Sequence, residues 1–103
     1  MAGLTLYEKL EQIENRYAEM TAQLSSPEVH NDSASFQKLA RAHADLSAMV
    51  EKYREWKQVD KGLTEAKQMV LEADDPEMKQ LAADEERQLT ERKETVEREL
   101  KFL

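Results

Sequence analysis

Apolar side chains recur at helical spacing along most of the chain. In the first part they advance in alternating steps of four and three residues: Leu6, Leu10, Ile13, Tyr17, Met20 and Leu24. Such steps keep the side chains on one side of a helix and are typical of packing against a partner helix. Thr5, followed three residues later by Glu8, forms a capping-box pattern. The sequence therefore predicts a helix over about residues 5–24.

A second, longer helix is predicted over about residues 34–73, capped by Asp32 or Ser33. Its first apolar series is Phe36, Leu39, His43, Leu46, Val50 and Tyr53. Continuing this series would place Lys57, Asp60, Thr64 and Lys67 at the interface. Moving back by one residue gives a better series: Trp56, Val59, Leu63, Ala66, Val70 and Ala73. One residue corresponds to about 100° around a helix, so the two halves are expected to present different faces.

Two interpretations of this step remain open. In the first, the helix changes partner: the first helix folds back on residues 36–53, and a third helix folds back on residues 56–73. In the second, the apolar stripe drifts along a single continuous helix. Gly62 lies near the step and costs roughly 1 kcal/mol relative to alanine in a helix, so a bend there is compatible with the pattern.

Two connections separate the predicted helices. Ser25-Ser26-Pro27 ends the first helix, and a polar connection runs from Pro27 to Ser33. Asp75 followed by Pro76 is a typical cap and first helical position, which predicts a third helix over about residues 76–101. Its apolar stripe is weak: Met78, Leu81, Ala82, Leu89, Val96, Leu100 and Leu103, with Glu85 and Arg92 where leucine is expected.

Composition supports an all-α fold. Only two glycines and two prolines occur, 36% of the residues are charged, and no run of strand-forming residues alternates with period two. We therefore expect one domain spanning residues 1–103, an elongated, antiparallel, three-helix, coiled-coil-like bundle with a long central helix. The apolar end, Phe102-Leu103, indicates that the natural chain continues beyond it.

Charge and residue usage limit the possible partners. The net charge of −7 divides into −4 for residues 1–33, +1 for residues 34–73 and −4 for residues 74–103. This balance gives no overall attraction to phosphate, so direct nucleic-acid binding by this domain is not expected. Cysteine is absent, no long apolar stretch occurs, and Met1–Leu10 contains Glu8 and Lys9 where a signal peptide needs an apolar core. We expect a cytoplasmic protein that does not enter a membrane.

No pattern of catalytic, cofactor-binding or metal-ligating residues stands out. His30 is expected in a polar connection, exposed to solvent, and His43 in the second helix is expected to be partly buried and bonded to a neighbour. Asp74-Asp75 is interpreted as a helix cap. Asp84-Glu85-Glu86 points in three directions on a helix and cannot converge on one cation. The prediction is that the chain is not an enzyme and has no cofactor.

A basic and aromatic patch on the second helix is the remaining candidate. Arg54, Lys57 and Lys61 share one side of the helix near Tyr53 and Trp56, and such a patch could contact RNA. The favoured interpretation is structural: the aromatic rings pack against a partner helix, and the basic side chains pair with acidic neighbours. Trp56 in particular is expected to be buried at the step between the two series.

The order of these landmarks resembles that in a known family. The segments SSPEVHNDSASFQKLARAHADLSAMVEKYREWKQ and LEADDPEMKQLAADE resemble the helical N-terminal domain of bacterial class I peptide chain release factors. The resemblance covers essentially the whole chain. The Trp56 region and the turn at residues 74–78 are most like the release factor 1 group, rather than release factor 2 or the organellar factors.

The resemblance implies a role in translation termination without chemistry in this domain. Members of the family direct stop-codon-dependent release of the nascent peptide through a codon-reading tripeptide and a Gly-Gly-Gln loop. Neither motif is present here. A Gly-Gly-Gln loop is excluded because the only glycines are Gly3 and Gly62. The implied partners are the stalk base of the large ribosomal subunit, the class II release-factor GTPase and the rest of the domain's own chain.

Three hypotheses follow. The first is a docking or regulatory domain of a termination factor. The second is a free-standing coiled-coil adaptor or chaperone arm that self-associates, in which case the isolated domain forms a homodimer. The third is an RNA-gripping helical arm. The sequence does not identify the partner-contact residues, and the exposed connection from Pro27 to Ser33 is the favoured region because loops often carry function.

Overall fold

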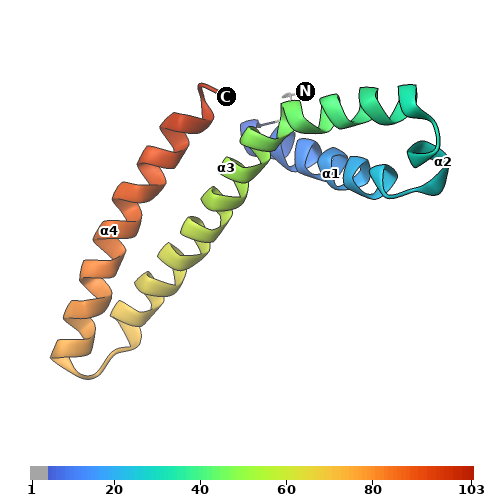
Figure 1. Ribbon diagram of the computed structural model, residues 1–103. Coiled ribbons are helices and arrows are strands. Elements are labelled where there is room, and N and C mark those ends of the chain that lie inside the picture. Colours follow the sequence, from blue (N-terminus) through green and yellow to red (C-terminus); the bar gives the residue numbers. More distant parts are fainter. Residues whose placement is uncertain (1–4) are drawn as a thin grey trace. The chain divides into compact units, whose positions relative to one another are not determined.

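The computed structural model describes residues 5–103 and contains four helices (Figure 1). They are α1 (Leu6–Leu24), α2 (Pro27–His30), α3 (Ser33–Glu72) and α4 (Pro76–Leu100). Residues 1–4, which include Gly3 and the start of the Met1–Leu10 segment, lie outside the described residues. No strand occurs within residues 5–103, so the predicted all-α class with a long central helix is confirmed.

Side-chain caps start α1 and α4 as their sequences predict. The Thr5 hydroxyl accepts a hydrogen bond of 3.1 Å from the backbone N–H of Glu8. At the start of α4, the Asp75 carboxylate accepts one of 2.9 Å from the backbone N–H of Glu77, and Pro76 occupies the first helical position. Each cap satisfies a backbone donor that has no partner inside the helix. The expected roles of Thr5 and Asp75 are therefore confirmed.

The connection between the first two predicted helices differs from the expected loop. It contains the one-turn helix α2, in which Pro27 occupies the first helical position and Glu28 lies in the first turn. Both residues favour a helix start. At the start of α3, the Asp32 carboxylate accepts hydrogen bonds from the backbone N–H of Ser35, at 3.3 Å, and from its hydroxyl, at 2.9 Å. Asp32, rather than Ser33, is thus the capping side chain.

The chain divides into two compact units between Glu51 and Lys52, and α3 contributes to both. In the N-terminal unit, which is described from residue 5 to residue 51, α1 packs against the first part of α3. The Tyr17 ring stacks on the His43 ring with centroids 4.0 Å apart, and Thr21 Oγ1 lies 2.8 Å from His43 Nε2. In the C-terminal unit, residues 52–103, α4 runs back along the second part of α3 (Figure 1).

Contacts between α3 and α4 follow an antiparallel order. Lys52, at the start of this part of α3, pairs with Glu99 near the end of α4, whereas Gly62 lies beside Leu89 in the middle of α4. The first part of α3 therefore packs on α1 and the second on α4, which confirms the change of partner. The helix is continuous from Ser33 to Glu72, Gly62 included, so no break accompanies the change.

Both apolar series of α3 are buried or partly buried along their whole length. Val50 and Tyr53 end the first series with exposed fractions of 1% and 5%, and Leu63 and Ala66 lie in the middle of the second with 6% and 4%. In the rejected continuation of the first series, Thr64 and Lys67 are exposed, whereas Lys57 and Asp60 are partly buried beside Tyr53 and Lys93. The backward step of one residue is therefore a property of the folded helix.

The apolar stripe of α4 is shorter than predicted. Ala82, Val96 and Leu100 are buried, with exposed fractions of 4%, 0% and 4%. Met78 and Leu81, which were expected in the same stripe, are 48% and 63% exposed. They lie in the first two turns of α4, next to the connection with α3, where a helix pair has fewer neighbours to cover its side chains.

The close approach of α3 and α4 at Gly62 generates a testable prediction. A methyl group placed on Gly62 would lie 3.4 Å from Cδ1 of Leu89, which is an ordinary van der Waals contact. Replacing a glycine in a helix by alanine lowers the entropy lost on folding. We expect Gly62→Ala to raise the free energy of unfolding by about 0.5–1 kcal/mol, measured by urea denaturation and followed by the fluorescence of the sole tryptophan.

A reversed substitution is the control. Ala48 is exposed within α3 of the N-terminal unit, and Ala48→Gly should lower stability by about the same amount. A destabilised Gly62→Ala protein would show that Leu89 cannot accommodate the methyl group.

Candidate docking surfaces

His43 has a structural role. Its ring is partly buried, stacks on Tyr17 with an angle of 15° between the ring planes, and shares a hydrogen bond with the Thr21 hydroxyl. The ring stacking and the hydrogen bond both join α1 to α3 within the N-terminal unit. The predicted structural role of His43 is confirmed.

His30 differs from the expected loop residue. It is the last residue of α2, and its ring lies edge-on to the Phe36 ring with centroids 5.4 Å apart and planes at 90°. The side chain remains exposed. His30 therefore helps to hold the short helix against the start of α3, and the expectation of a residue in an irregular loop is wrong.

One residue of each acidic cluster has a local partner. Asp84 accepts a hydrogen bond of 3.0 Å from the Gln80 side chain and lies 3.7 Å from the Arg87 guanidinium. Asp75 caps α4. Among residues 5–103, no three His, Cys, Asp or Glu side chains are grouped so that they could hold a metal ion. The same residues contain no helix long and apolar enough to span a membrane.

The aromatic side chains of the basic patch are packed within the C-terminal unit. Tyr53 is buried, Trp56 is partly buried, and their rings are nearly parallel with centroids 6.1 Å apart. Lys57 Nζ lies 4.8 Å from the centre of the Tyr53 ring, and Lys93 Nζ of α4 lies 5.7 Å from that of Trp56. Burial of Tyr53 and partial burial of Trp56 leave little ring surface for a stacked base, which supports the structural interpretation of the two rings.

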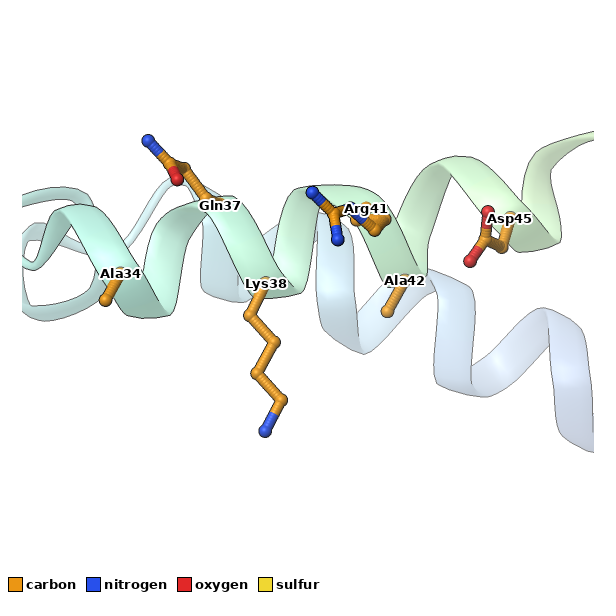
Figure 2. A pocket seen from close by; sticks show the side chains of 6 residues that line it. All are labelled: Ala34, Gln37, Lys38, Arg41, Ala42 and Asp45. Atoms are coloured by element: carbon orange, nitrogen blue, oxygen red, sulfur yellow. The ribbon is translucent and has the colours of Figure 1, made fainter.

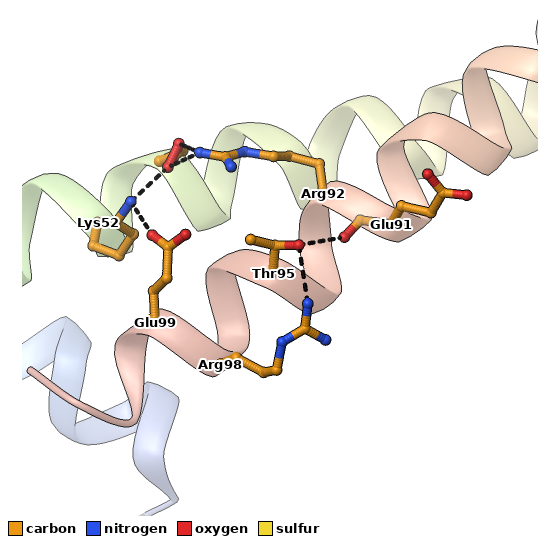
Figure 3. A network of polar contacts seen from close by, with 7 residues as sticks. Lys52, Glu91, Arg92, Thr95, Arg98 and Glu99 are labelled. Atoms are coloured by element: carbon orange, nitrogen blue, oxygen red, sulfur yellow. Dashed lines mark hydrogen bonds and ion pairs between the residues drawn. The ribbon is translucent and has the colours of Figure 1, made fainter.

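A polar network joins α3 and α4 on the edge of their interface (Figure 3). Glu55 accepts a hydrogen bond of 2.8 Å from Arg92, and Lys52 pairs with both Glu55, at 3.1 Å, and Glu99. The Arg92 guanidinium, and less strongly Lys52, lowers the pKa of Glu55 below its ordinary value, against the opposing effect of burial. Glu99 and Glu55 together raise the pKa of Lys52. Arg92, which interrupts the apolar stripe of α4, therefore has Glu55 as its ion-pair partner.

Four exposed apolar side chains belong to the last turn of α3 and the first two turns of α4. The exposed fractions are 49% for Met69, 80% for Leu71, 48% for Met78 and 63% for Leu81. Acidic side chains flank them at Glu72, Asp74, Asp75 and Glu77. We call these eight residues the hairpin end. Large exposed apolar side chains with a polar rim are typical of surfaces that contact other proteins.

A hollow of about 310 Å³ lies in the N-terminal unit. All three helical segments of the unit contribute to its lining, which consists of Arg16, Met20, Val29, Ser35, Lys38, Leu39 and Ala42. We call it the interhelical hollow. Lys38 and Ala42 also line a groove of about 400 Å³ along α3, where Ala34, Lys38 and Ala42 follow one another at intervals of one turn (Figure 2).

Neither surface was identified from the sequence. Met78 and Leu81 were assigned to the core, and Met69 and Leu71 fall outside the apolar series of α3. The hollow combines residues from three helices, so no spacing within one helix could indicate it. Only its position near the connection Pro27–Ser33, through Val29, agrees with the region that was favoured for partner contact.

The fold and these surfaces define a class: an all-helical module with apolar and charged side chains exposed on its surface. Residues 13–103 match the PCRF domain family, and the chain belongs to that family. The relatives are peptide chain release factors. Peptide chain release factor 1 of Syntrophomonas wolfei is 47% identical over 98 residues, covering 95% of this chain and 28% of that protein.

Two further relatives carry the same name. Peptide chain release factor 1 of Caldicellulosiruptor saccharolyticus is 40% identical, and that of Geotalea uraniireducens 41% identical, each over 95% of this chain. The chain spans 28% and 27% of these proteins, a little over a quarter of their length. No solved structure matches the chain. The resemblance to class I release factors, and to the release factor 1 group among them, is confirmed.

The polar network between α3 and α4 predicts a pH dependence of stability. Because the folded state lowers the pKa of Glu55 below 4.5, its contribution is present above pH 4.5 and is lost as the pH falls through the folded pKa. Glu55→Gln removes the titrating group. We expect the wild-type protein to be more stable than this variant at neutral pH by roughly 0.5–1 kcal/mol, and the difference to disappear well below pH 4.5.

Urea denaturation at several pH values, followed by Trp56 fluorescence, measures this difference. Glu91→Gln, an exposed position on α4, is the matched control and should leave the pH dependence unchanged. A constant difference between wild type and Glu55→Gln at all pH values would contradict the assignment.

Proposed function

We propose that the chain is the helical docking domain of a translation termination factor. In the full-length protein it would support stop-codon-dependent release of the nascent peptide from the ribosome, while doing no chemistry itself. The observation that carries the proposal is the PCRF domain match over residues 13–103, together with relatives that are peptide chain release factors 1. The proposed partners are the stalk base of the large ribosomal subunit, the class II release-factor GTPase and the remainder of the full-length protein.

The hairpin end is the best candidate for the contact with the ribosome. Leu71 and Leu81 are its most exposed apolar side chains, at 80% and 63%, and burying them against a partner would be favourable. Glu72, Asp74, Asp75 and Glu77 would repel phosphate groups. This combination favours a protein component of the stalk base with a basic rim over a direct contact with ribosomal RNA.

Ribosome binding tests the docking role. The chain should co-sediment with ribosomes, and Leu71→Ser combined with Leu81→Ser should weaken this binding at least about tenfold. Ribosomes stripped of their stalk-base protein should bind the wild-type chain as weakly as complete ribosomes bind the variant.

Leu6→Ser is the matched control, because Leu6 is a 42% exposed leucine at the start of α1, in the other unit. It should bind like the wild-type chain. Equal binding by the hairpin-end variant and the wild type would overturn the assignment of the contact surface. No binding to ribosomes by any of the proteins would overturn the docking role itself.

Peptide release tests the absence of chemistry in this domain. Added alone to ribosomes that hold peptidyl-tRNA at a stop codon, the chain should release no peptide above the spontaneous rate. Release by the 103-residue chain would contradict the proposal.

Self-association distinguishes the adaptor hypothesis. Sedimentation equilibrium should give a monomer for a docking domain and a tight dimer for a free-standing adaptor. A dimer that persists in the Leu71→Ser, Leu81→Ser variant would favour the adaptor.

A further inference from the structure

The interhelical hollow has a chemically uniform floor. Met20 from α1, Val29 from α2, and Leu39 and Ala42 from α3 supply only aliphatic and thioether groups. Met20 is buried, and Val29, Leu39 and Ala42 are partly buried. The volume of about 310 Å³ lies at the lower end of the range of roughly 300–1,000 Å³ for ligand pockets. A site of this size suits one anchoring aliphatic side chain.

The rim of the hollow is basic. Arg16 enters from α1 and Lys38 from α3. Arg16 makes one ion pair, 3.5 Å long, with Glu19, and both side chains are more than half exposed, so the pair is weak. Within residues 5–103, the exposed Lys38 ammonium makes no ion pair or hydrogen bond. In the close-up of α3, the Lys38 side chain extends away from the helix beside Ala42 (Figure 2).

Two carboxylates near the rim, those of Asp32 and Glu19, are already engaged, whereas Asp45 lies in the adjoining groove along α3. The Asp32 carboxylate accepts two hydrogen bonds from Ser35, which lower its pKa. These bonds also occupy the Ser35 hydroxyl, which lines the hollow. Glu19 is the partner of Arg16. Lys38 is therefore the rim charge that is most available to a ligand, and Arg16 could exchange Glu19 for a better partner.

We propose that the interhelical hollow binds a short acidic segment of a partner protein, with one aliphatic side chain on the floor and carboxylates against Lys38 and Arg16. The reason for choosing an acidic segment is charge complementarity with Lys38 and Arg16. At physiological ionic strength charges are screened beyond about 8 Å, so the two rim cations act on a bound segment more strongly than the net charge of −7 does. The proposal does not depend on the ribosome-docking role, which concerns the other unit.

RNA fits the hollow less well than an acidic peptide does. Recognition of unpaired bases relies on aromatic side chains that stack on them, and none of the residues that line the hollow is aromatic. An aliphatic floor next to two cations instead matches an amphipathic helix, which anchors aliphatic side chains in a groove and keeps its charges at the edge.

Binding of a defined peptide tests the proposal. The probe is a short helical peptide composed of leucine and glutamate, measured by fluorescence anisotropy and by NMR chemical-shift changes in the 103-residue chain. We expect saturable binding, with the largest shifts at Val29, Leu39 and Ala42. Lys38→Glu replaces an attraction at the rim by a repulsion and should weaken binding roughly tenfold.

Lys67→Glu is the matched control. It makes the same change of charge at an exposed position of α3 in the C-terminal unit, so it alters the net charge equally. This variant should bind the peptide like the wild type. A peptide with glutamine in place of glutamate should bind more weakly to the wild type, and should no longer distinguish Lys38→Glu from Lys67→Glu.

Several outcomes would overturn the proposal. The first is failure of the peptide to bind the wild type, and the second is equal weakening by Lys38→Glu and Lys67→Glu. Stronger binding of a single-stranded RNA oligonucleotide at the same residues would assign the hollow to nucleic acid. A concentration-dependent dimer that disappears in Lys38→Glu would assign it to a second copy of this chain.

Discussion

The backward step of one residue in the apolar pattern of α3 is the constraint on which the structure depends. A strict continuation from Tyr53 would have placed Lys57, Asp60 and Lys67 at the centre of the interface with α4, where burying charged side chains is costly. The step instead brings Trp56, Leu63 and Ala66 toward the interface, and it lets one continuous helix supply an apolar surface to α1 and another to α4. The helix α3 therefore contributes apolar side chains to the core of each unit.

The two units complete their cores differently. In the N-terminal unit, Leu10, Met20 and Val50 are buried, and the partly buried rings of Tyr17 and His43 stack between α1 and α3. In the C-terminal unit, the small residues Ala66 and Ala82 are buried together with larger ones such as Leu63, and Gly62 lies against the Leu89 side chain. Small residues bury little apolar area, which makes Val96 and Leu100 the main contributors from α4.

Ion pairs at the edge of the α3–α4 interface complement this thin core. Lys52, Glu55, Arg92 and Glu99 are between 25% and 45% exposed, so each pair contributes modestly in water. Their greater effect is on register. A shift of α4 by one residue would move Arg92 away from Glu55 and Lys93 away from Asp60, and it would leave charges facing apolar groups.

The sequence predicted features that depend on neighbouring residues and missed those that depend on distant ones. The Thr5 and Asp75 caps and the step at Trp56 are local or periodic, so spacing was sufficient to find them. Helix α2 is too short for periodicity to reveal, and only Pro27 marked it. Leu81 is exposed because it lies at the end of a helix pair. The interhelical hollow exists because three helical segments meet there. Neither feature can be predicted from the spacing of residues along one helix.

The two surfaces differ in charge, and this difference bears on which partners each unit can select. The hairpin end surrounds Leu71 and Leu81 with carboxylates, whereas the interhelical hollow surrounds an aliphatic floor with Arg16 and Lys38. Two such surfaces are complementary in charge, and a contact between unlike surfaces of separate copies would form open chains. The net charge of −7 on each copy opposes that association at low ionic strength, and does so much less at physiological ionic strength, where charges are screened beyond about 8 Å.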